Sequence, residues 1–273
     1  MSSGLTRVAS NIQAMQSLFN LNKTNSAVAK HQLALSTGKK INTPGDDPAG
    51  YQLARGLEAR RSGLEAALEN VSNAQSILNI ADGGYQNIMD ILQTMKAKAT
   101  QAADGSLGTT QRTAINDQFT ALRNEIDSIV SETTFNGNNL IDGTFSVTFQ
   151  TGEQSGETLS VALSSADSSG LSINNISMTS QASASAAIAT LDSAINTLAS
   201  RAQDVGEYKA RLSAKENTLS VAITNTEDVR STYEDADFAK EQMEVLKMQI
   251  LQQTAVASLS QANTAPQLVL SLF

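Results

Sequence analysis

The residue types that carry most enzyme chemistry are scarce in this sequence. It has one histidine, His31, and no cysteine. A nucleophile–histidine triad or a zinc site needs several such side chains in a fixed arrangement. No GxGxxG or GxxxxGK[ST] motif offers a phosphate cradle either. We therefore predict no catalytic residue, no metal ligand and no cofactor, and we expect His31 to lie on the surface of a helix.

Acidic residues cluster at two places, and clustered carboxylates can serve a reaction or hold a cation. Asp46 and Asp47 are adjacent, between glycine and proline, where a carboxylate usually caps a helix, so one of them should cap the helix that follows. Glu234, Asp235 and Asp237 suit the start of a helix, where the macrodipole favours negative charge. Both clusters therefore indicate helix boundaries rather than chemistry.

Composition excludes several classes of partner. The 273 residues carry a net charge of −8, which argues against nucleic acid and against an anionic membrane surface. No run approaches the roughly 18 apolar residues of a membrane span. The first residues lack the charged start and apolar run of a secretory signal, so we expect either a cytoplasmic protein or export without a cleaved signal peptide.

Apolar residues at heptad spacing dominate the elements that remain. The first segment carries such a seam at Leu5, Val8, Ile12, Met15 and Phe19, with a helix stop expected at Gly38. A boundary rich in proline and glycine follows at 42–50. The pattern then predicts a helix over about 52–103, roughly 75 Å long, which Asp104 and Gly105 end. Its seam is Leu64, Ala67, Val71, Ala74, Leu78, Ala81, Tyr85, Ile88, Leu92, Met95, Ala99 and Ala102.

A short link predicts that the next helix, over about 115–129, lies antiparallel to this one. Alternating apolar residues at 145–149 and 159–163 predict a β-hairpin. The Ser-rich stretch at 164–185 is expected to be a solvated loop with little regular structure. A second long helix is expected from about 186 to 230.

The last segment is again apolar on one side. Val245, Met248, Ala255 and Leu259 line one face, and Met243, Leu246 and Ile250 widen it. The chain closes with an apolar run that includes Leu270, Leu272 and Phe273. Residues 1–42 hold five bases and no acid, whereas 231–273 hold five acids and two bases, so the two ends should pair. Two helices cannot cover such wide apolar faces alone, so we predict that further copies bury them and that the ends fold on assembly.

Several motifs in both terminal thirds resemble those of bacterial flagellins. They are LFNLNK at 18–23, LSTGKKIN at 35–42, DDPAG at 46–50, FNG at 135–137, YEDADFAKE at 233–241, QILQQ at 249–253 and QANTAPQLVLSL at 261–272. The resemblance is to a short form with little or no outer variable domain, since only 164–185 stands in that domain's place.

The resemblance implies a mainly α fold of long antiparallel coiled-coil rods, a small β-hairpin region and terminal helices in an inner coiled-coil layer. The expected parts are an inner-tube helix at 1–44, rod helices at 45–144, the hairpin and Ser-rich surface at 145–185, a rod helix at 186–230 and a second inner-tube helix at 231–273. It also implies a subunit that polymerises into the extracellular flagellar filament for motility, exported unfolded by the flagellar type III apparatus. The implied partners are further copies, an export chaperone at the C-terminal segment, and the filament cap and hook–filament junction proteins.

Two positions depart from flagellins that the vertebrate innate receptor senses. Thr94 stands where those flagellins carry an Arg after a Leu-Gln pair, and Gln118 stands where they carry a Glu. Threonine cannot supply the planar, multi-donor fork of arginine. We therefore expect weak or absent receptor activation.

Other functions are compatible with parts of the pattern. A hook–filament junction protein shares the plan of terminal helices, although the dense motif match at 233–272 favours a flagellin. A surface adhesin or polysaccharide-binding protein would use the Ser-rich stretch, but it would need an aromatic groove, and Phe145 and Phe149 belong to the predicted hairpin core.

Overall fold

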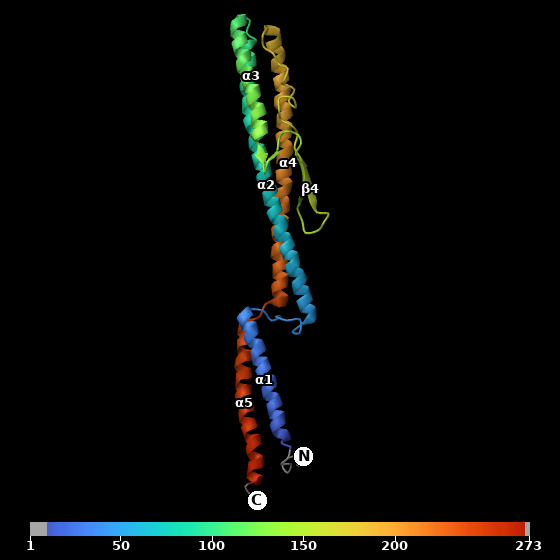
Figure 1. Cartoon of the computed structure of the whole chain (residues 1–273), viewed down its shortest axis with the longest axis vertical. Coiled ribbons are helices and arrows are strands. Elements are labelled where there is room, and N and C mark those ends of the chain that lie inside the picture. The colour runs from blue at the N-terminus through green and yellow to red at the C-terminus, as the bar shows by residue number, and fades with distance from the viewer. Residues whose placement is uncertain (1–9, 271–273) are drawn as a thin grey trace. The chain divides into compact units, whose positions relative to one another are not determined.

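The chain is mainly helical in a computed structural model that describes residues 10–270, with only the backbone described over 265–270. Figure 1 shows the elements, which follow one another in the described residues as α1 (Ile12–Thr37), α2 (Pro48–Ala102), α3 (Thr109–Glu132), β1 (Thr134–Phe135), β2 (Asn138–Asn139), β3 (Ser146–Gln150), β4 (Thr158–Ala162), α4 (Gln181–Glu234) and α5 (Phe238–Leu270). The predicted long helices and single longer hairpin are therefore confirmed.

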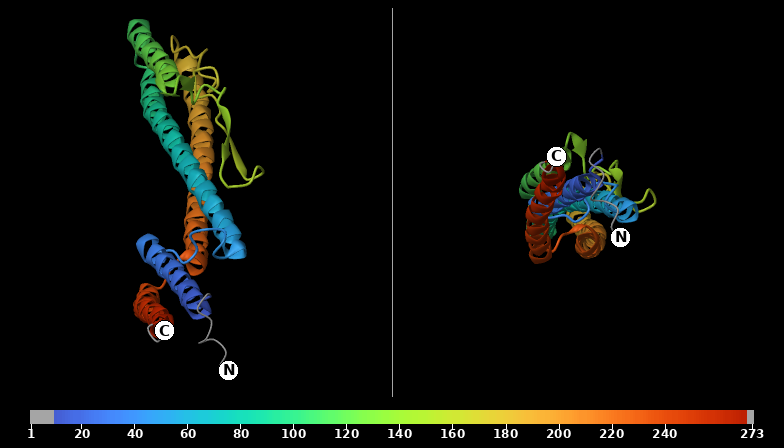
Figure 2. Two further views of the ribbon diagram at one scale, coloured as in Figure 1. Left: turned by 60° about the horizontal axis from the view of Figure 1, so that its bottom comes forward. Right: turned by 90° about the horizontal axis from the view of Figure 1, so that it is seen from below.

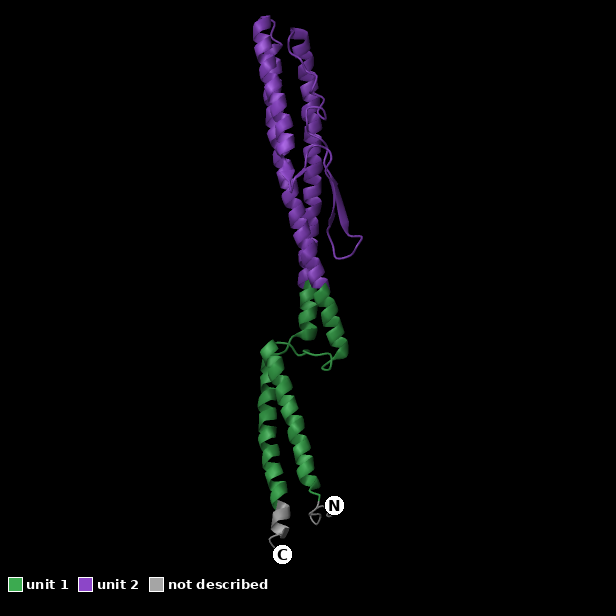
Figure 3. Cartoon of the chain, viewed as in Figure 1, with its two compact units in different colours: residues 1–59, 225–273 green, residues 60–224 purple. Residues whose placement is uncertain are grey.

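The chain forms two compact units, coloured separately in Figure 3. We call residues 1–59 and 225–273 the terminal unit, and 60–224 the rod unit. Helices α2 and α4 contribute to both. The five segments expected from the sequence divide the chain by its expected place in a filament, not by compactness. Their boundaries therefore stay a prediction.

Helices α2, α3 and α4 build the rod unit as a bundle with one continuous apolar core (Figures 1 and 2). All twelve seam residues predicted for α2 are buried, and α3 and α4 contribute buried side chains such as Phe119 and Leu191. A strict heptad keeps one stripe of each helix turned to its neighbours, which is why sequence spacing identified these residues. Arg112 holds the turn between α2 and α3 by donating to the carbonyl oxygens of Ala102 at 3.0 Å and Asp104 at 2.6 Å.

The helix α2 continues through Gly83 and Gly84 without a break. A Cβ atom at Gly84 would lie 2.9 Å from Ile141 Cδ1 and 3.0 Å from Thr133 Oγ1, whereas a Cβ at Gly83 would meet nothing within 4 Å. Gly84 therefore lets the segment after α3 approach the helix closely.

The hairpin of β3 and β4 is antiparallel, with Val147 opposite Val161 and Phe149 opposite Leu159. Leu159 and Val161 are buried against the bundle. Arg60 of α2 pairs with Glu153 near the hairpin turn at 3.1 Å. These contacts fix the hairpin on the rod unit.

The expectation of a solvated loop with little regular structure at 164–185 holds only in part: regular structure is sparse over 164–180, but this stretch is packed rather than solvated, and 181–185 are helical. Helix α4 begins at Gln181, because Ser180 and Ser183 exchange capping hydrogen bonds at its start. Residues 164–180 lack a long regular element, but their apolar side chains are buried, at Ala166, Leu171, Ile173 and Met178. Asp127 of α3 accepts from the backbone N–H of Ser168 at 2.8 Å and from its hydroxyl at 2.9 Å, which ties this segment to the bundle.

Candidate assembly surface

The pairing of α1 with α5 uses one heptad stripe on each helix. The stripe of α1 is Ala14, Ser17, Leu21, Thr24, Val28, His31 and Leu35, and that of α5 is Glu241, Val245, Met248, Gln252, Ala255, Leu259 and Ala262, all partly or fully buried. We call these residues the intrachain seam. It is rich in small and polar side chains, which suits close pairing of two helices more than burial of a large apolar surface.

Polar contacts along the intrachain seam fix an antiparallel register. Asn11 donates to the carbonyl oxygen of Ala262 at 2.8 Å, and Gln252 donates to Oδ1 of Asn25 at 2.8 Å. His31 Nδ1 lies 2.6 Å from Glu241 Oε2. His31 was expected on a helix surface; it lies on α1 with its side chain 23% exposed, partly covered where it meets Glu241 of α5.

Large apolar side chains lie away from this seam. Ile12, Met15 and Phe19 of α1 are 58%, 69% and 65% exposed. On α5 the exposed set is Phe238, Met243, Leu246, Ile250, Leu251 and Val256. We call these residues, with those of α1, the apolar stripes.

The apolar stripes stay exposed although α1 and α5 are paired. Every side chain named in them is at least 45% exposed. An exposed apolar surface of this kind on a soluble protein is typical of a docking surface.

The residues predicted to pack between subunits therefore fall into two groups. Ile12, Met15 and Phe19 lie on an apolar stripe, whereas Val245, Met248, Ala255 and Leu259 lie in the intrachain seam. Leu5, Val8, Leu272 and Phe273 lie outside the described residues, and only the backbone of Leu270 is described. The sequence pattern indicated Met243, Leu246 and Ile250 only as a widening of the face. Phe238, Leu251 and Val256 were not predicted to lie on this surface, although large apolar residues on a helix were a signal for it.

A buried carboxylate organises the connection between the two ends. Glu234 was expected at a helix start, but it is the last residue of α4, and its Oε1 accepts from Lys39 Nζ at 2.7 Å. Arg230 also donates to this carboxylate, and Arg55 lies 3.6 Å away. Burial opposes ionisation of Glu234, but the contacts with Lys39 and Arg230 prevail and lower its pKa.

Backbone hydrogen bonds reinforce the same connection. The N–H of Lys40 donates to the carbonyl of Glu234 at 2.7 Å, and the N–H of Ala236 donates to that of Gly38 at 2.8 Å. Gly38 adopts a left-handed φ of 72° and ends α1 as predicted. Asp237 caps α5 through the N–H of Ala239 at 2.9 Å.

The predicted cap of α2 is Asp47, whose Oδ1 accepts from the N–H groups of Ala49 and Gly50 at 3.2 and 3.1 Å. Asp46 instead pairs with Lys30 at 2.9 Å and accepts from the N–H of Thr43. These contacts, with that to Lys30 the strongest, hold the pKa of Asp46 well below its ordinary value.

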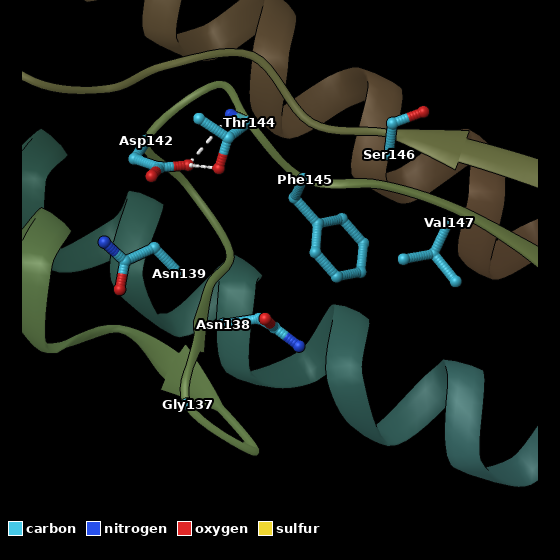
Figure 4. Close-up of a pocket in the computed structure, with 8 residues that line it drawn as sticks. All are labelled: Gly137, Asn138, Asn139, Asp142, Thr144, Phe145, Ser146 and Val147. Carbon is cyan, nitrogen blue, oxygen red and sulfur yellow. Dashed lines mark hydrogen bonds between the residues drawn. The ribbon is translucent and has the colours of Figure 1, made fainter.

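A hollow of about 430 Å³ lies in the rod unit, between the turn at Gly137 and the start of β3, and Figure 4 shows the residues that line it. Its one carboxylate, Asp142, accepts from the N–H and the hydroxyl of Thr144 at 2.8 and 2.7 Å.

No group of three or more potential metal ligands occurs within the described residues. None of the helices in that part of the chain is long and apolar enough to cross a bilayer. Thr94 and Gln118 are both exposed on the rod unit.

Comparison with known proteins gives this architecture a family. The family model of the bacterial flagellin N-terminal helical region matches residues 8–146, and that of the C-terminal helical region matches 188–273. Flagellin FlaB2 of Treponema pallidum is 34% identical over 96% of this chain and 98% of its own length. A flagellin of Bacillus subtilis is 33% identical over 97% of this chain and 99% of its own.

A solved structure described as a flagellar hook-associated protein from Vibrio parahaemolyticus shares the fold. Its TM-score is 0.60 at 15% identity, over 70% of this chain and all of that chain. Likeness at that identity concerns the fold alone. With both family regions present and relatives matched over nearly their full length, the chain belongs to the bacterial flagellins, the structural subunits of flagellar filaments.

Proposed function

We propose that copies of this flagellin polymerise by burying the apolar stripes of α1 and α5 against neighbouring copies, in a filament outside the cell. The observation that carries the proposal is that Ile12, Met15 and Phe19 are exposed while the intrachain seam is already filled. Each square ångström of apolar surface removed from water contributes about 25 cal/mol. A heterologous contact repeated from copy to copy produces a helical filament.

In this filament α1 and α5 form the inner coiled-coil layer, and the rod unit surrounds it. Leu5, Val8, Leu270, Leu272 and Phe273 extend the interchain contacts at the two ends. Val245, Met248, Ala255 and Leu259 hold α1 and α5 together, so they support the surface from within. The role is structural, and no catalytic step is needed for it.

The remaining partners follow from the same proposal. An export chaperone would cover the apolar C-terminal segment before assembly, and export through the flagellar apparatus would need no cleaved signal peptide. The filament cap and the hook–filament junction proteins would contact the first and last copies. Thr94 and Gln118 would leave the innate receptor without its usual polar partners, and a gain of reporter-cell signalling by Thr94→Arg would support this reading.

Truncation tests the assembly role. Removing about 45 residues from each end takes away the apolar stripes and leaves the rod unit, whose core lies between Leu64 and Leu219. We expect the trimmed chain to stay monomeric in sedimentation and to form no filaments in electron micrographs, while the full chain polymerises. Filaments of the trimmed chain would show that the ends are not required.

A further inference from the structure

Two basic side chains of α4 differ from the other basic residues described below, because they form no ion pair with a described residue. Arg60, Lys96 and Lys209 each pair with an acid, at 3.1, 2.5 and 3.1 Å. Arg211 and Lys215 are exposed, and within the described residues neither makes an ion pair or a side-chain hydrogen bond. They are four residues apart, so they project from the same side of the helix.

These cations border a hollow between α4 and the hairpin. Its lining residues are Thr158, Leu159, Arg211, Ala214, Lys215 and Thr218, around a volume of about 290 Å³. Figures 1 and 2 show the hairpin beside α4. We call this hollow the basic groove, and it suits an acidic partner that approaches the side of the rod unit.

The same chain carries an acidic surface that would fit. Asp117, Glu125 and Glu132 are exposed on α3, and no described residue pairs with their carboxylates. Heptad geometry puts them within about 80° of one another, opposite the buried Phe119 and Ile126. We call these three residues the acidic face.

The basic groove and the acidic face lie at different levels along the rod unit. Gly84 of α2 faces Thr133 at the end of α3, and Asp82, two residues away, pairs with Lys209 of α4. Thr133 and Lys209 therefore lie at about the same height along the rod unit. From there Glu125 lies roughly 12 Å in one direction, and the pair Arg211 and Lys215 lies roughly 3 to 9 Å in the other. The two surfaces are thus offset by roughly 20 Å along the axis.

We propose that the basic groove of one copy receives the acidic face of a second copy that is displaced by about this offset along the rod axis. The inference rests on the proposed polymerisation and adds a contact between rod units to it. The complementary charges argue for a second copy, because a repeated heterologous contact needs two different, matching surfaces on each chain. Both surfaces lack ion pairs with the residues that the structure describes, so both are available to a second copy.

Charge reversal tests the contact in full-length chains. The groove variant carries Arg211→Glu and Lys215→Glu, and the face variant carries Glu125→Lys and Glu132→Lys. Each variant alone brings like charges together, and we expect its critical concentration for polymerisation, measured by sedimentation, to rise about tenfold, or about 1.4 kcal/mol. The single reversals Lys98→Glu and Glu69→Lys serve as controls at other charged sites of the rod unit, and we expect little change from them.

An equal mixture of the two variants gives the decisive result. Each groove then meets an oppositely charged face on the other variant, so we expect the mixture to polymerise near the wild-type concentration, with both chains in the same filaments. The penalty of each variant alone should shrink in 1 M salt, where charges are screened within about 3 Å. A fold defect could not be rescued by mixing, and circular dichroism of the monomers checks for one.

Three outcomes would overturn the contact. Variants that polymerise like the wild type would show that another partner, such as an anionic polymer, or none, occupies the basic groove. Variants that fail alone and also fail when mixed would show that the two surfaces do not meet. A wild-type chain that stays monomeric would contradict the proposed function itself, and this inference with it.

Discussion

Lys39 Nζ lies 2.7 Å from Glu234 Oε1, so the segment after α1 is tied to the last residue of α4. The side chain of Glu234 is 2% exposed, and it also accepts from Arg230. Two sequence segments about 195 residues apart thus share one buried carboxylate. α1 ends two residues before Lys39, and α5 begins four residues after Glu234. The placement of both terminal helices therefore depends on this ion pair.

Replacing Glu234 by glutamine should loosen the connection. The amide keeps the shape of the side chain but removes the anion that Lys39 and Arg230 share, and only Arg230 keeps another carboxylate, that of Glu227. Losing one partner of a buried ion pair costs about 3 kcal/mol. We expect faster hydrogen exchange at the N–H groups of Lys40 and Ala236, which bond across the connection. Asp228→Asn, an exposed change on the same helix, is the control, and equal exchange in both variants would contradict the role of Glu234.

The same carboxylate should make the terminal unit sensitive to acid. The folded pKa of Glu234 is lowered from 4.5, and that of Asp46 from 3.8, so both acids stabilise the folded chain above those values. Their contribution is lost as the pH falls below about 4.5 and through the lowered folded pKa values. Thermal melts between about pH 3 and pH 7 should show this loss for the wild type and a shallower loss for Glu234→Gln. Parallel curves would mean that Glu234 does not contribute.

Two neighbouring glycines of α2 should respond to alanine in opposite directions. Gly83→Ala adds a methyl group in open space, and the better helix propensity of alanine should stabilise the rod unit by about 0.5–1 kcal/mol. Gly84→Ala gains the same propensity but pushes against Ile141 and Thr133, and overpacking of this kind costs about 1–3 kcal/mol. Urea unfolding of the two variants measures both changes. A stabilised Gly84→Ala variant would show that the segment at 133–141 yields easily.

The core of the rod unit could be predicted from the sequence because burial there follows a simple period. Leu78, Leu92 and Leu198 are found where the heptads put them, since long helices in a bundle turn one stripe inwards throughout. The packing of 164–180 could not be predicted in this way. Ile173 and Met178 follow no helical or strand period, and the contact of Ser168 with Asp127 joins residues 41 positions apart.

Heptad spacing put Val245 and Ile250 of α5 in different groups, but it did not show which group meets α1. Val245 and Ile250 are both aliphatic, and both belong to a broad apolar surface, so spacing alone does not say which of them meets α1. The register is decided by pairs such as His31 with Glu241 and Asn25 with Gln252, which become partners only once the helices are antiparallel. Glu234 was assigned to a helix start for a similar reason, because Lys39 and Arg55 come to it from distant parts of the chain.

Val245 and Ile250 therefore offer the sharpest test of the proposed surface. Val245 is 8% exposed in the intrachain seam, and Ile250 is 64% exposed on an apolar stripe. With α1 and α5 paired in the lone chain, Val245→Ala should lower the free energy of unfolding of the monomer by about 1–2 kcal/mol, because it leaves a cavity between them. An unchanged monomer would instead support the expectation that the two ends fold on assembly. Ile250→Ala removes a side chain that the lone chain barely buries, so the monomer should change by less than about 0.5 kcal/mol.

For polymerisation the order should reverse, with Ile250→Ala affected more than Val245→Ala. If neighbouring copies bury Ile250, its truncation costs each added copy about 2 kcal/mol, and the critical concentration should rise more than about tenfold. Unfolding is followed by circular dichroism below the critical concentration, and polymerisation by sedimentation of the same preparations. An Ile250→Ala variant that polymerises normally and unfolds as early as Val245→Ala would place Ile250 in an intrachain contact, and the apolar stripe of α5 would lose its part in assembly.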